Sequence, residues 1–129
     1  TKDLGLKVFI TGQEKDLIRE IQGEIPNSES FETNSLEELA SLLMQMDLFI
    51  TNDTGPQHLA YALQVPVLAL FASTDPACCG PTESPNAIVM AKPAACTPCI
   101  KRKCKLPFCF LQIGVDQVFT RIKKSLHPR

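Results

Sequence analysis

Short apolar runs alternate along this chain with segments of helical periodicity, and this order most limits the folds that it can adopt. Runs of strand length, rich in β-branched residues, occupy residues 7–11, 47–51, 66–71 and 87–91. Connections of helical length separate most neighbouring runs, as parallel βαβ crossovers require. The pattern predicts an α/β fold, a three-layer Rossmann-like domain with a mostly parallel sheet.

Local signals place helices between and after these runs. Apolar residues recur at helical spacing around residues 17–21, 35–46, 56–64 and 115–126. Ser35 and Glu38 have the spacing of a capping box, which marks a helix start. Pro56 suits the first position of the third helix. Residues 30–34 are a weaker strand candidate.

The length and composition allow one globular domain. The chain has 129 residues, of which 44% are hydrophobic, and this is enough for a buried core. No apolar run is long enough to span a bilayer. Because the sequence enters a strand at Lys7 and has no initiator Met, we expect residues 1–129 to be a fragment.

The stretch ITNDTGPQHLA, residues 50–60, places a polar turn between a strand and a helix. In open parallel sheets, ligands bind beyond the carboxyl ends of the strands, where a helix start offers free N–H groups. A phosphate suits such a position, because Gly55 lets an anion approach the backbone and Thr54 and His58 can donate hydrogen bonds.

A carboxylate does not suit phosphate, so Asp53 needs a different role. It is expected to accept a hydrogen bond from a sugar hydroxyl or to cap the helix. The alternative for the whole segment is a turn without a ligand, since Asx and Gly chemistry alone explains such a turn.

Several ordered motifs resemble those of one family. They are the S-L-x-E-L helix, the D-T-G-P-x-H-L-A turn, the P-V-x-A-L-F strand, the T-D-P-x-x-x-G-P loop and the segment C-T-P-C-I-K-R-K-C. From residue 7 to about residue 126, the chain resembles the C-terminal domain of the ADP-heptose:lipopolysaccharide heptosyltransferases, glycosyltransferase family 9.

The resemblance implies the C-terminal half of an inverting GT-B glycosyltransferase. The whole protein would transfer heptose, or a related sugar, from ADP-heptose to the lipopolysaccharide inner core. Residues 1–129 would be its nucleotide-sugar-binding domain, without the N-terminal acceptor domain and without the first strand of this domain. The implied substrate-binding residues are Asp53, Thr54, Gly55, Pro56 and His58 in the turn, and Gly12, Glu14 and Asn34 elsewhere in the pocket.

The resemblance also implies what this chain lacks. The base that activates the acceptor would lie in the N-terminal domain, so no catalytic residue is expected here. A phosphate-binding Lys would precede the first strand present. No cofactor or catalytic metal is expected, because a helix dipole and basic groups would neutralise the leaving diphosphate. The expected partners are the nucleotide-sugar donor and a lipid-linked acceptor, and no nucleic acid.

Four of the six cysteines have the spacing C-x2-C-x4-C-x4-C; they are Cys96, Cys99, Cys104 and Cys109. Four thiolates could hold a structural Zn²⁺, although this spacing differs from that of zinc ribbons. Disulfides and free thiols are the alternatives, and an iron–sulfur cluster fits the spacing poorly.

Charge is divided unevenly along the chain. Residues 1–91 hold 4 Lys or Arg and 13 Asp or Glu. Residues 92–129 hold 9 Lys or Arg and 1 Asp or Glu. A run of basic residues adjoins apolar ones, which favours peripheral contact with an anionic membrane surface. The run comprises Lys101, Arg102, Lys103, Lys105, Leu106, Phe108 and Phe110.

This pattern indicates a cytoplasmic protein that contacts the cytoplasmic face of the inner membrane. One alternative is a solvated basic loop. The other belongs to a different functional class: a non-catalytic nucleotide-binding or partner-binding α/β module that uses the cysteine-rich basic loop.

Overall fold

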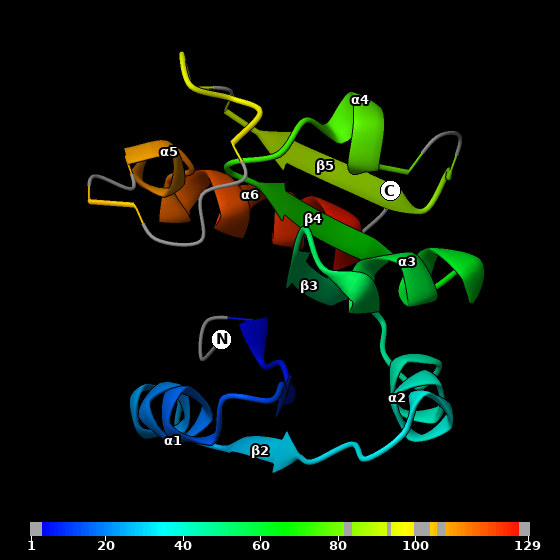
Figure 1. Cartoon of the computed structure of the whole chain (residues 1–129). Coiled ribbons are helices and arrows are strands. Elements are labelled where there is room, and N and C mark those ends of the chain that lie inside the picture. The colour runs from blue at the N-terminus through cyan, green and yellow to red at the C-terminus, as the bar shows by residue number, and fades with distance from the viewer. Residues whose placement is uncertain (1–3, 82–83, 93, 100–103, 106–107, 127–129) are drawn as a thin grey trace. The chain divides into compact units, whose positions relative to one another are not determined.

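The computed structural model describes residues 4–81, 84–92, 94–99, 104–105 and 108–126. Its described strands pair only in parallel, which confirms the predicted α/β class (Figure 1). The chain divides into two compact units, Thr1–Leu39 and Ala40–Arg129, and the strands form one sheet in each.

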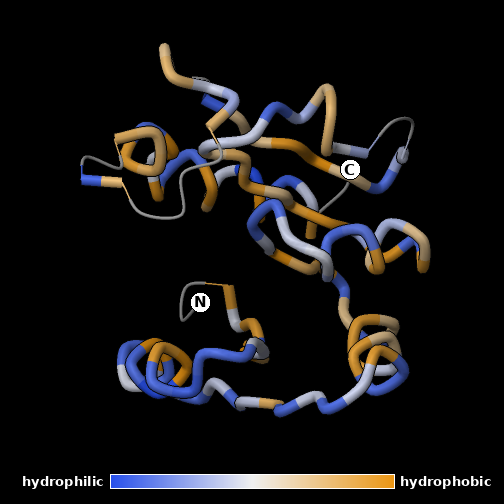
Figure 2. The backbone as a smooth tube through the Cα atoms, viewed as in Figure 1, coloured by the Kyte–Doolittle hydropathy of each residue, from blue (hydrophilic) through white to orange (hydrophobic). Residues whose placement is uncertain are grey.

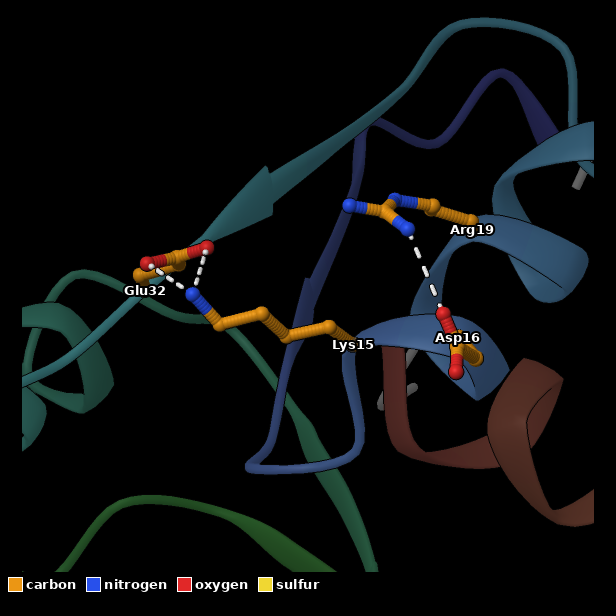
Figure 3. Close-up of polar contacts among 4 residues, drawn as sticks. All are labelled: Lys15, Asp16, Arg19 and Glu32. Carbon is orange, nitrogen blue, oxygen red and sulfur yellow. Dashed lines mark hydrogen bonds and ion pairs between the residues drawn. The ribbon is translucent and has the colours of Figure 1, made fainter.

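The first unit contains a β–α–β motif. Strand β1 (Val8–Thr11) pairs in parallel with β2 (Ser28–Phe31), and α1 (Lys15–Glu24) connects them. An ion pair joins Lys15, at the start of α1, to Glu32 after β2, with an N–O distance of 3.0 Å (Figure 3). This ion pair is exposed, so it contributes little to the free energy of folding. The β–α–β connection, and not the ion pair, mainly holds the two strands together.

Helix α2 (Leu36–Leu43) begins at the predicted capping box. The Glu38 N–H donates to the Ser35 hydroxyl at 3.2 Å. The Glu38 carboxylate accepts from the Asn34 N–H at 2.7 Å. The box therefore fixes the chain direction from Asn34 into the helix.

The second unit contains a three-stranded sheet in the order β3–β4–β5. Strands β3 (Phe49–Asn52), β4 (Val67–Phe71) and β5 (Ala87–Ala91) are parallel. Helix α3 (Gly55–Ala62) connects β3 to β4. Because all three strands point the same way, the segments that follow them all begin at the same end of the sheet, at the carboxyl ends of the strands.

The core of this unit surrounds β4. Four of its five residues are buried, as expected for the central strand, and Figure 2 shows its apolar character. α3 contributes Ala60 and the following turn contributes Val65. The buried apolar residues of the described chain are Leu39, Leu43, Ala60, Val65, Val67, Leu68, Ala69, Phe71, Ala72 and Ala94.

Two short helices were not predicted. Helix α4 (Pro76–Cys79) lies in a segment expected to be loop, and the Asp75 carboxylate accepts from the Ala77 N–H at 2.9 Å to cap it. Helix α5 (Phe108–Leu111) lies in the expected cysteine-rich loop. Each is a single turn, too short for hydrophobic periodicity to reveal. The predicted closing helix is present as α6 (Val115–Leu126).

Replacing Leu68 by Ala should lower the free energy of unfolding by about 2–5 kcal/mol, because the side chain is fully buried in the central strand. Ile50 pairs with it in register but is 43% exposed, so Ile50→Ala should cost only about 1 kcal/mol. Urea denaturation followed by circular dichroism measures both. Equal losses would contradict the assignment of β4 as the centre of the core.

Candidate functional site

The turn between β3 and α3 leaves the start of the helix without a side-chain cap. Thr54 is the N-cap residue and has extended backbone, but its hydroxyl makes no capping bond. That hydroxyl lies 3.4 Å from the Asn52 carbonyl and 3.3 Å from the Thr51 hydroxyl. In the first turn, Pro56 has no N–H and the Gln57 N–H donates to the Thr54 carbonyl at 3.1 Å. The Gly55 N–H and the positive end of the helix dipole therefore remain for the space beyond the strand.

Gly55 is the first residue of this helix, and packing within the described chain does not require a glycine there. A Cβ on Gly55 would have no heavy atom within 4 Å, and its φ is not in the left-handed region. Pro56 follows near the first position of α3, as predicted, and its ring has no N–H to satisfy. The open space beside the Gly55 backbone is where an anion can approach the helix start.

The other end of α3 is held by hydrogen bonds in a Schellman motif. The Val65 N–H donates to the Ala60 carbonyl and the Gln64 N–H to the Tyr61 carbonyl, each at 3.0 Å. Gln64 has a φ of 58°, where glycine is the usual residue. Its carbonyl accepts from the Asn86 amide at 3.1 Å.

Buried Gln57 connects α3 to the segment after β4. It is fully buried, and its amide nitrogen donates to the Cys79 carbonyl at 3.1 Å. The Gln57 Oε1 atom has no hydrogen-bond partner. One face of α3 is thus fixed against α4, which leaves the face with His58 open.

A cavity of about 390 Å³ borders this face of α3. It is lined by α3, its C-terminal turn and the segment after α4; the residues are His58, Tyr61, Ala62, Gln64, Gly80, Pro81 and Ser84. The rings of His58 and Tyr61 meet edge to face, with centroids 6.2 Å apart. His58 is exposed, so it reaches both the cavity and solvent.

Asp53 and Tyr61 are electrostatically coupled. Burial raises the pKa of Tyr61 to about 12, and the negative charge of Asp53 adds to the effect. The Tyr61 hydroxyl is buried and has no hydrogen-bond partner among the described residues. Since no side chain caps α3, Asp53 does not take the capping role that was one of its two expected roles. Its carboxylate is half-buried in the turn, where a hydroxyl donor can reach it.

The three other predicted residues lie in the first unit. Gly12 follows β1, and Glu14 occupies the N-cap position of α1 without a capping bond. Asn34 follows β2 and precedes the capping box. All three therefore lie beyond the carboxyl ends of parallel strands, where α/β sheets bind ligands. Their role in substrate binding stays a prediction.

The cysteines are not assembled into a site within the described residues. All six are free thiols. In that part of the chain, no group of three His, Cys, Asp or Glu residues lies close enough to hold a metal ion. The Cys99 N–H donates to the Ser73 carbonyl at 2.7 Å, which attaches the loop to the segment after β4. These free thiols do not support the disulfide alternative, and the zinc alternative stays a prediction.

Sequence reasoning missed Tyr61, Gln57 and the segment around Gly80. Tyr61 and Gln57 lie on a helix whose start was recognised, and Tyr61 follows His58 by three residues, so it lies on the same face. That spacing could have indicated Tyr61. The approach of Gly80 depends on long-range packing, for which the sequence carries no local signal.

A family model described as glycosyltransferase family 9 (heptosyltransferase) matches residues 2–109. The chain belongs to glycosyltransferase family 9. The match covers the β3–α3 turn and most of the α/β elements. The resemblance seen in the sequence motifs is therefore confirmed.

Relatives in the family match part of the chain. Two proteins of Campylobacter jejuni, each named lipooligosaccharide heptosyltransferase 2, are 33% and 34% identical over 84 and 82 residues, or 64% and 62% of this chain. Lipopolysaccharide heptosyltransferase 1 of Pseudomonas aeruginosa is 29% identical over 108 residues, 71% of this chain. The chain spans only 27%, 26% and 30% of these proteins. No solved structure matches it.

Ultraviolet titration of tyrosinate should report Tyr61 alone, because the chain has one Tyr and no Trp. We expect a pKa near 12. Asp53→Asn should lower the pKa but leave it above 10.0, since burial is the larger cause. Asp47→Asn, the matched control, should leave it unchanged.

The folded phenol keeps its proton to a higher pH than the unfolded chain. Its contribution to stability is therefore complete below pH 10.0 and is lost as the pH rises towards 12. A Tyr61 pKa of 10.0 in both the native chain and Asp53→Asn would show that the ring is solvated and uncoupled.

Proposed function

We propose that this chain is the donor-binding half of a glycosyltransferase that takes heptose, or a related sugar, from ADP-heptose. The single observation that carries the proposal is the uncapped start of α3 beside the open face of Gly55. A diphosphate there would accept hydrogen bonds from the Gly55 N–H and the Thr54 hydroxyl. The positive end of the helix would stabilise the charge of the leaving nucleotide, so no bound metal is needed.

Asp53 and His58 would act on either side of this phosphate. His58 can donate from a ring nitrogen at the rim of the cavity. Asp53 would accept from a hydroxyl of the donor sugar, because its carboxylate forms no cap on α3. The family resemblance assigns a role towards the nucleoside to Gly12, Glu14 and Asn34, which lie in the first unit.

The acceptor half would come from the remainder of the longer protein, which accounts for most of the relatives' length. We expect the catalytic carboxylate and a phosphate-binding Lys there. Within the described sheet of the second unit, β3 pairs only with β4. Its other edge is unpaired among the described strands, so a further parallel strand can pair there.

Transfer would occur to the lipopolysaccharide inner core at the cytoplasmic face of the inner membrane. Lys105 and α5 support peripheral contact, because Phe108, Phe110 and Leu111 are 45%, 50% and 82% exposed. Lys101, Arg102, Lys103 and Leu106 lie outside the described residues. In the described part of the chain, no helix is long and apolar enough to cross a membrane.

Gly55→Ala should weaken the binding of ADP roughly tenfold, because the new Cβ occupies the space through which phosphate reaches the backbone. Its free energy of unfolding should stay the same or rise by about 1 kcal/mol, since Ala suits a helix better than Gly. Amide chemical shifts on titration with ADP, with UDP as the comparison for base preference, measure the affinity. Shifts should appear at Thr54, Gly55 and His58.

Gly23→Ala is the matched control. Gly23 also lies in a helix, and its added Cβ would likewise meet no atom within 4 Å. The Gly23→Ala variant should show a similar change in the free energy of unfolding and no change in its affinity for ADP. If the two variants bind ADP equally well, α3 does not hold the phosphate. Shifts that avoid the β3–α3 turn altogether would favour the non-catalytic module.

Residues 1–129 alone should transfer no sugar from ADP-heptose to a lipopolysaccharide acceptor, whereas the full-length protein should. The reason is that the proposed base and acceptor site lie outside this chain. A transfer assay at matched concentrations of the two proteins distinguishes them. Turnover by residues 1–129 above the rate without protein would place a base within this chain.

A further inference from the structure

A second hollow lies beside β5, the edge strand that β4 separates from β3. It has a volume of about 550 Å³ and lies between β5 and α6. Residues Val89–Lys92 line one side of it and one face of α6 lines the other. Both elements, labelled in Figure 1, belong to the second unit.

The hollow runs alongside the C-terminal half of β5 and reaches the end of that strand. Val89, Met90 and Ala91 lie within β5, and Lys92 directly follows it. Met90 is level with Asn52, the last residue of β3, because both pair with Leu70 of β4.

Helix α6 turns a polar stripe towards the hollow. Gln117, Thr120, Arg121 and Lys124 recur at the spacing of one helical face, and all four line the cavity. Four apolar residues of the helix lie on the opposite face and are half-buried; they are Val118, Phe119, Ile122 and Leu126. The protein thus places charged side chains around a concave surface.

The charges around the hollow favour an anion. Lys92, Arg121 and Lys124 line it together with one acid, Asp116. In the part of the chain that the structure describes, none of the three cations forms an ion pair. Arg in particular suits bidentate binding of phosphate oxygens. Val89, Met90 and Ile113 supply an apolar surface in the same hollow.

We propose that the β5–α6 hollow binds a phosphate-bearing ligand, with Arg121, Lys124 and Lys92 holding the phosphate and Val89, Met90 and Ile113 contacting its carbon frame. The site is separate from the β3–α3 turn and does not rest on the proposed function. Either a lipid head group or a free phosphate ester has this chemistry.

Titration of residues 1–129 with inorganic phosphate and with glycerol 3-phosphate, followed by amide chemical shifts, tests the site. Shifts are expected at Lys92, Thr120, Arg121 and Lys124. Arg121→Gln and Lys124→Gln should each weaken binding roughly tenfold. Lys123→Gln is the matched control, because Lys123 lies over the Phe119 ring at 4.8 Å and does not line the hollow.

A second arm identifies the source of the phosphate. Co-sedimentation is measured with phosphatidylcholine vesicles that contain or lack phosphatidylglycerol. Binding of the soluble phosphates supports a free phosphate ester as ligand. Vesicle binding alone, lost in Arg121→Gln but kept in Lys123→Gln, supports a lipid head group.

Two results would overturn the proposal. One is the absence of binding in both arms. The other is an equal loss in Lys123→Gln and Lys124→Gln, which would show general attraction to a basic surface. Gly55→Ala should leave the shifts around Arg121 unchanged, so failure of the donor site and failure of this site are distinguishable.

Discussion

Parallel pairing of β4 with a strand on each side is the constraint on which the second unit depends. A strand buried on both faces must satisfy its backbone groups with neighbouring strands, and β3 and β5 do this for β4. Parallel neighbours require crossovers, so α3 has to return the chain along the sheet. The same pairing brings the carboxyl ends of the strands together at one end of the sheet, where the turn at Thr54 follows β3 and Lys92, which lines the hollow, follows β5.

Helix α3 is held unequally at its two ends. Its last turn is closed by two Schellman hydrogen bonds, and Gln57, on the buried side of its first turn, donates to the Cys79 carbonyl of α4. Its first turn has neither a side-chain cap nor a packed Cβ at Gly55. This asymmetry gives a rigid helix with an exposed positive end, and such a helix suits the binding of charge better than an isolated loop does.

Much of the fold and part of the site could be predicted from the sequence. The strand at 87–91 and the capping box at Ser35 were placed correctly, because they depend on local periodicity and side-chain spacing. The weaker strand at 30–34 instead begins at Ser28, since few apolar residues mark its start. The approach of Gly80 to the cavity beside Tyr61 could not be predicted, because it arises from contacts between segments far apart in the chain.

The missing side-chain cap on α3 would link ligand occupancy to folding if the proposed phosphate binds there. In most helices a Ser, Thr or Asp side chain supplies an acceptor for the first N–H groups. Here the Gln57 N–H is bonded to the Thr54 carbonyl, and the acceptor for the Gly55 N–H would come from outside the chain. A bound phosphate would therefore act as the final structural element of α3, and the concentration of free ligand would set how firmly this part of the fold is held.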